Sequence, residues 1–149
     1  MKLSSPPKRL NKSRRMLEQY GNEICGQITE SNAFDVGSRI TDYFRYFRGN
    51  PQIDVGDFDR FVGALGFVFA RCVETVSDWK LEWLSLSEED LLDGVDCLTN
   101  ENHSLLVYPI GLVSSDFLRK THKSESFFKA LVIGSFPARE DHSLQELVM

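Results

Sequence analysis

Cys97 and His103 are the residues whose types and spacing come nearest to a catalytic pair. They bracket a predicted turn and could lie near each other, and an imidazole beside a thiol can generate a nucleophilic thiolate. No oxyanion element or orienting partner for the imidazole stands out in the sequence. The pair also lacks the two further ligands that a zinc site needs at suitable spacing. The sequence therefore favours structural roles for both residues.

Other routes to catalysis find little support in the sequence. His122 and His142 are too far from His103 and from each other to indicate a shared ligand set. No phosphate-binding loop, dinucleotide fingerprint, zinc-protease motif or nucleophile elbow occurs. Gly63 and Gly66 fall inside a predicted helix, where they cannot form a phosphate-binding loop. The chain is therefore predicted not to be an enzyme, and neither a cofactor nor a metal site is predicted.

Carboxylates offer the second kind of chemistry. Acidic residues crowd a predicted loop-and-turn region, and none is enclosed by apolar sequence that would raise its pKa for acid–base work. They form either a solvated acidic face or a contact surface for a basic partner, beside which Trp79, Trp83 or Tyr108 could supply an aromatic anchor. Structural roles fit both tryptophans better. The predicted partner-binding residues are Glu88, Glu89, Asp90, Asp93, Asp96 and Glu101.

Charge is distributed unevenly along the chain. Residues 1–15 hold six basic groups and no acidic one, whereas residues 54–101 hold twelve acidic and three basic residues. Pro6 and Pro7 oppose a helix, so residues 1–12 are predicted to form a flexible basic arm ahead of a single domain at 13–149. No apolar stretch follows the basic N-terminus, and the longest apolar run, 62–70, is too short to span a membrane. A cytoplasmic protein is expected.

A long helix over residues 54–76 is the element around which the fold must be built. Its large apolar residues recur at helical spacing for about five turns, which requires a buried face. Gly63, Gly66 and Ala70 form a second face. Because an interior glycine costs a helix about 1 kcal/mol relative to alanine, these small residues indicate the close approach of another backbone.

The remaining elements follow from the periodicity. Helices are predicted from Ser13 to about Ile28 and from Ala33 to Arg48, and strands over 79–84, 95–98 and 104–108. Two shorter helices are predicted at the C-terminal end, one beginning at Ser114 or Ser115 and one at Ser124 or Ser126. The predicted fold is α+β, with N-terminal helices and a long central helix packed on a small antiparallel sheet, followed by C-terminal helices.

The segment YFRYF, from Tyr43 to Phe47, alternates aromatic residues with Arg45 and is followed by Arg48. Aromatic and arginine side chains together can stack on nucleic-acid bases. At helical spacing, an amphipathic core face is the better explanation.

The region from Phe58 to about Lys120 carries FVGALGFVFARCV, WKLEW and LLVYPIGLVSSDFLRK in that order. This pattern resembles small cytosolic bacterial α+β proteins that occur as uncharacterised domains and as immunity proteins of toxin–immunity pairs. The resemblance covers under half of the chain. It implies a protein that binds and blocks a cognate toxin, often a nuclease, frequently through an acidic surface. Such interfaces diverge between pairs, so no functional residue is carried over.

The leading hypothesis is therefore a non-enzymatic binding protein, an immunity protein that neutralises a basic toxin domain, with no nucleic-acid or membrane partner. One alternative is a secretion chaperone or adaptor, which is expected to be a homodimer with an apolar groove. Another is an enzyme centred on Cys97 and His103. Binding of nucleic acid through the basic arm ranks below both.

Overall fold

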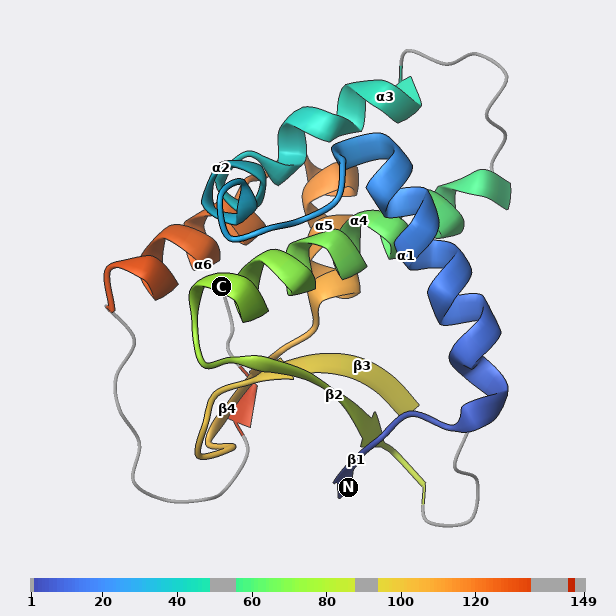
Figure 1. Cartoon of the computed structure of the whole chain (residues 1–149), viewed down its shortest axis with the longest axis vertical. Coiled ribbons are helices and arrows are strands. Elements are labelled where there is room, and N and C mark those ends of the chain that lie inside the picture. The colour runs from blue at the N-terminus through green and yellow to red at the C-terminus, as the bar shows by residue number, and fades with distance from the viewer. Residues whose placement is uncertain (1, 49–55, 88–93, 135–144, 147–149) are drawn as a thin grey trace.

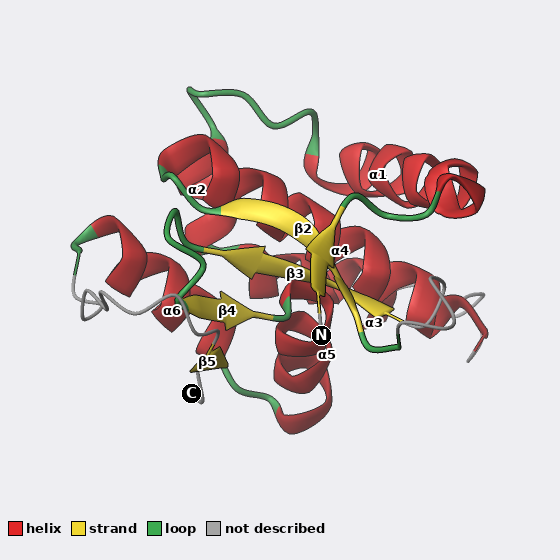
Figure 2. Ribbon diagram, turned by 90° about the horizontal axis from the view of Figure 1, so that it is seen from below, coloured by secondary structure: helices red, strands yellow, loops and turns green. Residues whose placement is uncertain are grey.

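The structure is a computed structural model and describes residues 2–48, 56–87, 94–134 and 145–146 of the chain. The described helices lie on one side of a small sheet, as Figure 1 and Figure 2 show from two directions. This arrangement confirms the predicted α+β fold. The helices are α1 (Asn11–Cys25), α2 (Ala33–Ser38), α3 (Phe44–Arg48), α4 (Gly56–Val76), α5 (Pro109–Arg119) and α6 (Lys123–Val132), with 3-10 turns η1 (Lys8–Leu10) and η2 (Ile40–Tyr43). The strands are β1 (Lys2–Ser4), β2 (Lys80–Ser85), β3 (Gly94–Thr99), β4 (Leu105–Val107) and β5 (Gln145–Glu146).

The sheet follows the chain order from β1 to β5. Strands β1 to β4 are antiparallel to their neighbours, and β5 adds to the edge of β4 in the parallel direction. The three predicted strands correspond to β2, β3 and β4, and each predicted end differs from the observed one by one residue. Leu81 lies opposite Leu98, and Leu98 lies opposite Val107, so the inward positions of the three strands are in register.

Helix α4 runs through the middle of the helical layer above the sheet and contacts α1, α2, α5 and β2 (Figure 1). Its first described residue is Gly56, and the two earlier residues of the predicted helix lie outside the described residues. Almost every residue from Phe61 to Val73 is buried, because the helix is covered on several sides. The pattern of apolar residues therefore predicted both this helix and its central place.

The two glycines of α4 have different neighbours. A Cβ atom at Gly66 would lie 2.6 Å from Ile110 Cγ1 and 2.8 Å from Ile110 Cα, so α5 crosses directly over this position. A Cβ atom at Gly63 would lie 3.4 Å from Leu17 Cδ1, which is the far end of a flexible side chain of α1. The close approach of another backbone, expected for both glycines, occurs at Gly66.

Replacing Gly66 with alanine is expected to lower the free energy of unfolding by about 2 kcal/mol, because the backbone of α5 must move to admit the methyl group. Gly63→Ala is the matched control in the same helix. There the methyl group meets only Leu17, and alanine gains up to about 1 kcal/mol of helix propensity, so stability should stay the same or rise slightly. Urea denaturation of the two variants measures the difference. Equal free energies of unfolding for the two variants would show that close packing of α5 on Gly66 is unimportant.

The single helix predicted from Ala33 to Arg48 is divided into α2, η2 and α3. Arg39 leaves helical geometry, with φ −130° and ψ 28°. The amide of Thr41, which a continuous helix would direct to a carbonyl of the preceding turn, donates instead to Glu125 Oε1 of α6 at 3.1 Å. A contact between distant parts of the chain thus replaces a local hydrogen bond and bends the segment.

The N-terminal segment also differs from expectation. Within residues 1–12, predicted as a flexible arm, the structure has β1 and η1, and α1 begins at Asn11. Leu3 pairs with Leu84 of β2 and packs against the apolar cluster on that face of the sheet. A three-residue strand with one apolar residue has too little periodicity to be recognised from sequence.

Helix α5 begins at Pro109, earlier than the predicted start at Ser114 or Ser115. Proline was expected only to end the preceding strand. It does follow β4, but it also occupies the first turn of the helix, where a missing N–H costs nothing.

The core has two parts. The larger lies between the helices and the sheet and includes Phe61, Phe69, Leu98, Phe127 and Phe128. The smaller lies on the other face of the sheet and consists of Leu84, Cys97 and Leu106, with Leu3, Val95 and Tyr108 packed around them. None of the helices in the described part of the chain combines the length and the apolar character needed to cross a membrane.

Candidate functional site

The predicted acidic contact surface is only partly within the described residues. Glu88, Glu89, Asp90 and Asp93 lie outside them, whereas Asp96 lies within β3 and Glu101 lies in the turn that follows this strand. The two described carboxylates have different surroundings.

Asp96 is engaged inside the molecule. It lies on the helix side of β3, where its carboxylate accepts a hydrogen bond from Nη1 of Arg14 in α1. The Arg14 guanidinium also lies 4.9 Å from the ring centroid of Phe67 in α4. Burial raises the pKa of Asp96 above its ordinary value, and the contact with Arg14 offsets part of that rise. Asp96 therefore joins α1 to the sheet.

Glu101 is exposed and lies in the turn between β3 and β4. It borders a hollow of about 380 Å³, here called the turn hollow. Lys80 and Thr99 are partners in the β2–β3 ladder, so Asp78 just before β2 comes beside Glu101 just after β3. The described residues that line the turn hollow are Asp78, Lys80, Thr99, Asn100, Glu101 and His103.

The turn that carries Glu101 is held by the side chain of Asn100. Its Nδ2 donates to Asn102 Oδ1 and to Ser104 Oγ, both at 2.9 Å, and its Oδ1 accepts from the amide of Leu105 at 2.9 Å. The backbone closes where the His103 amide donates to the Asn100 carbonyl at 3.0 Å, with His103 at φ 57°. Polar side chains in a turn commonly hydrogen-bond the local backbone in this way. The turn that forms one side of the turn hollow is therefore held in a single conformation.

His103 has Glu82 as its partner. Its Nε2 lies 3.0 Å from Glu82 Oε2, and the hydroxyl of Thr99 donates to the same carboxylate oxygen. Cys97 is fully buried opposite Glu82, and burial, followed by the negative charges of Glu82 and Asp96, raises the pKa of the Cys97 thiol to about 12. A thiol with that pKa is protonated at neutral pH, so this geometry gives the Cys97–His103 hypothesis no support.

The other histidines were not predicted to have a site role. His122 Nδ1 lies 2.9 Å from Thr41 Oγ1 and 3.4 Å from Glu125 Oε2, at the junction of η2 and α6. His142 lies outside the described residues. Among the residues that the structure describes, no three histidine, cysteine, aspartate or glutamate side chains are grouped as metal ligands.

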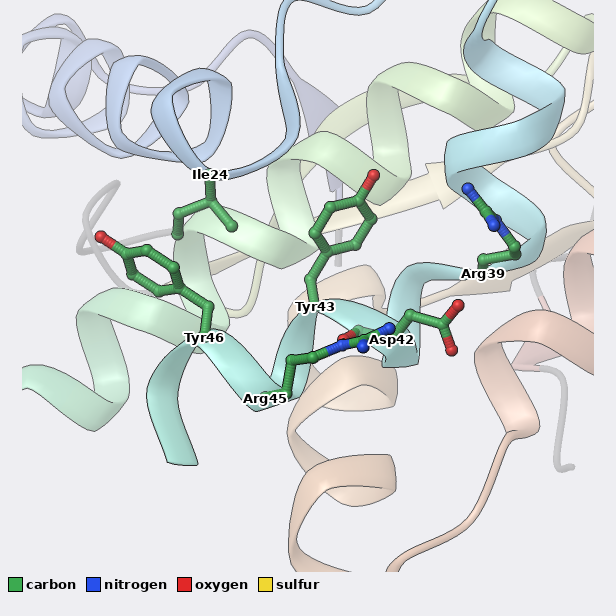
Figure 3. A pocket seen from close by; sticks show the side chains of 6 residues that line it. All are labelled: Ile24, Arg39, Asp42, Tyr43, Arg45 and Tyr46. Atoms are coloured by element: carbon green, nitrogen blue, oxygen red, sulfur yellow. The ribbon is translucent and has the colours of Figure 1, made fainter. Parts of the chain in front are cut away.

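A second hollow, of about 290 Å³, lies between the end of α1 and the η2–α3 segment (Figure 3). Its described lining residues are Ile24, Arg39, Asp42, Tyr43, Arg45 and Tyr46, and it is here called the arginine–tyrosine hollow. The YFRYF segment thus divides between two environments. Phe44 is buried in the core, whereas Tyr46 is exposed and Tyr43 and Arg45 border the hollow. Sequence periodicity predicted the core face and gave no sign of the hollow.

The electrostatics of this hollow are mixed. Arg39 Nη2 donates to Asp35 Oδ2 at 2.9 Å, and Arg45 Nε donates to the backbone carbonyl of Asp42 at 3.1 Å. Burial raises the pKa of Tyr43, and the positive charge of Arg39 acts against that rise, so this guanidinium is near the phenol. The hollow combines hydrogen-bond donors with an apolar surface supplied by Ile24.

Comparison of the chain with protein-family models, with curated proteins and with solved structures finds no match.

Proposed function

We propose that this chain is a non-enzymatic binding protein that acts in the cytoplasm and uses an acidic surface to hold a basic protein partner. The partner that best fits this proposal is the toxin domain of a toxin–immunity pair, which the chain would neutralise by covering its surface.

The observation that carries the proposal is the pairing of two exposed carboxylates, Asp78 and Glu101, across the turn hollow. Glu82 adds a third carboxylate nearby, and Lys80 is the one lysine or arginine among the described residues that line the hollow. The hydrogen bonds of Asn100 fix the turn, so little conformational entropy is lost when a partner binds there. A basic side chain could thus meet carboxylates that are already in place.

The charge of the whole chain supports the same partner. The net charge is −5, and acidic residues are concentrated in 54–101. An acidic surface attracts a basic protein over several ångströms and accelerates association, and this effect falls as salt rises. The residues of 88–93 remain part of the predicted contact surface, whereas Asp96 is removed from it by its contact with Arg14.

The test begins with tagged protein as bait in a lysate of its own cells, at low and high salt, with bound chains identified by mass spectrometry. Association of the captured basic partner is then measured by surface plasmon resonance with Asp78→Asn/Glu101→Gln. We expect the association rate at low salt to fall about threefold to tenfold and to depend less on salt.

The matched control is Glu30→Gln/Asp59→Asn, which removes two exposed carboxylates elsewhere and gives the same net charge. The control should associate at the rate of the unmodified protein. If both variants lost the same fraction of the association rate, the loss would come from net charge alone, and the turn hollow would be rejected as the contact site. Capture of an acidic partner, or of none at either salt concentration, would reject the proposed function.

The alternative functions have their own discriminating observations. A secretion chaperone is expected to be a homodimer, so a monomer in sedimentation equilibrium would count against it. An enzyme centred on Cys97 requires a reactive thiol, and failure of iodoacetamide to modify Cys97 in the folded protein at neutral pH would exclude it.

A further inference from the structure

Two arginines and two tyrosines gather at the arginine–tyrosine hollow, and the proposed function does not use them. We propose that this hollow is a second interaction site, which accepts an acidic side chain and its adjoining apolar group from a protein partner. The site is independent of the turn hollow, because α4 lies between the two (Figure 1).

The size of the hollow sets the scale of its occupant. Its volume of about 290 Å³ is at the lower limit of small-molecule pockets. A space of this size can hold an acidic side chain together with part of an adjoining apolar group. Tyrosine and arginine are the residue types that most often dominate the energy of protein–protein contacts, and here they surround one concave place.

The aromatic wall is held in place before any partner binds. The ring of Tyr46 stacks nearly parallel to that of Phe61, with centroids 6.3 Å apart and planes 8° apart. Phe61 is fully buried, whereas Tyr46 is 47% exposed, so the tyrosine ring rests on the core and retains an open side. Tyr43 and Ile24 also pack against the core. A prearranged apolar surface reduces the entropy lost on binding.

Hydrogen-bond donors select an acidic occupant. Arg39 and Arg45 border the hollow, and Asp42 is the one carboxylate among the described lining residues, while Asp35 pairs with Arg39 from outside the lining. Each guanidinium has five N–H groups, and the bonds to Asp35 and to the Asp42 carbonyl use one each. The planar group pairs well with a carboxylate through two parallel hydrogen bonds.

Figure 3 shows how these groups are arranged. The hydroxyl of Tyr43 and the guanidinium of Arg39 extend toward the same side, and Ile24 and Tyr46 lie on the other side of the Tyr43 ring. Arg45 extends along the base toward Asp42. A carboxylate can therefore meet the Arg39 guanidinium while its apolar neighbour lies against Ile24 and Tyr46.

The whole molecule disfavours a nucleic acid here. A net charge of −5 repels a polyanion at long range, and nucleic-acid affinity depends on many phosphate contacts to basic groups. One carboxylate requires only the free N–H groups of a guanidinium. A lysine or arginine side chain has donors and no acceptor, so it would meet only further donors on Arg39 and Arg45 and is excluded on that ground.

The test is a titration of ¹⁵N-labelled protein with a blocked peptide of alternating glutamate and phenylalanine, compared with the same peptide carrying lysine in place of glutamate. We expect the acidic peptide to shift the amide signals of Ile24 and of residues 39–46, with a dissociation constant on the order of 1 mM or below. The lysine peptide should leave these signals unchanged.

Arg39→Gln/Arg45→Gln should weaken binding at least about tenfold, whereas Arg119→Gln, at an exposed arginine of α5, should leave it unchanged. Tyr46→Phe should retain binding and Tyr46→Ala should lose it. Equal shifts with both peptides, shifts spread over other surfaces, or no shifts at all would overturn the proposal. Shifts of the same amides by adenosine monophosphate and not by the acidic peptide would assign the hollow to a nucleotide and would also overturn it.

Discussion

Replacing Asp116 with alanine is expected to lower the free energy of unfolding by about 4 kcal/mol, as measured by urea denaturation. Asp116 is fully buried in α5. One carboxylate oxygen accepts hydrogen bonds from the Thr121 hydroxyl and the Lys123 amide, and the other from the amide and hydroxyl of Ser124. The two amides, each 2.8 Å from the carboxylate, belong to the first turn of α6. A negative charge there also interacts favourably with the positive end of the helix dipole. Alanine leaves these donors without their acceptor.

Two further variants distinguish the loss of the acceptor from general disturbance of the site. Ser124→Ala removes a donor and leaves the carboxylate bonded to the backbone, so about 1 kcal/mol should be lost. Asp116→Asn keeps one acceptor oxygen and should fall between the two. If Asp116→Ala costs no more than Ser124→Ala, the carboxylate does not hold α6 in place.

Replacing Arg14 with methionine should cost about 3 kcal/mol of unfolding free energy at neutral pH. The side chains of Arg14 and Asp96 are only 18% and 10% exposed, so the variant leaves a carboxylate in a poorly hydrated place without its cation. Thermal or urea unfolding measures the loss. The double variant Arg14→Met/Asp96→Leu removes both charges and should recover most of the stability, because an apolar pair avoids the cost of an unpaired buried charge. A double variant as unstable as the single one would contradict this account.

The pH dependence of the Arg14→Met variant follows from the same carboxylate. Burial already raises the pKa of Asp96, and removing the cation should raise it further. In the pH range between the unfolded and the folded pKa, the folded state binds more protons than the unfolded state. Stability from this group therefore increases as pH falls through the folded pKa and is lost as pH rises. The deficit of Arg14→Met relative to the unmodified protein should shrink in mild acid, and a deficit independent of pH would contradict this assignment.

The parts of the fold that the sequence predicts well are those in which local periodicity and burial agree. Helix α4 has apolar residues on most sides, and its predicted range agrees with the observed one at every described residue. The sequences of β2 to β4 have apolar positions separated by polar connecting segments, so the antiparallel meander follows from short-range pattern. Each of their predicted limits differs from the observed one by one residue.

The parts that the sequence did not predict depend on contacts between distant residues. The break between α2 and α3 arises because Thr41 bonds to Glu125, 84 residues away. The assignment of Asp96 to a contact surface overlooked Arg14, which is 82 positions earlier and belongs to a strongly basic segment. A carboxylate in a strand has no local signature that tells whether it faces solvent or a buried cation.

In the candidate sites too, some residues could be predicted from local sequence and others depend on contacts between distant parts of the chain. Glu101 was predicted because it lies in a polar turn. Asp78 was not predicted, although the same reasoning could have identified it, since it precedes the strand that pairs with β3. The arginine–tyrosine hollow required knowing that the end of α1 lies beside η2 and α3. Nothing in the spacing of Tyr43, Arg45 and Tyr46 indicates that neighbour.

The outer strands of the sheet also bear on aggregation. Strand β3 pairs with β2 along its whole length and with β4 at Leu98 and Thr99. Strand β2 is covered by β1 over Trp83–Ser85, and β4 is covered at Leu105 and Leu106 by the two described residues of β5. Unpaired strand edges are templates for pairing between molecules. Because β1 has only three described residues and β5 only two, their detachment would expose the edges of β2 and β4 while the helices remain packed. Association between molecules is therefore expected to begin from a nearly native state, well before global unfolding.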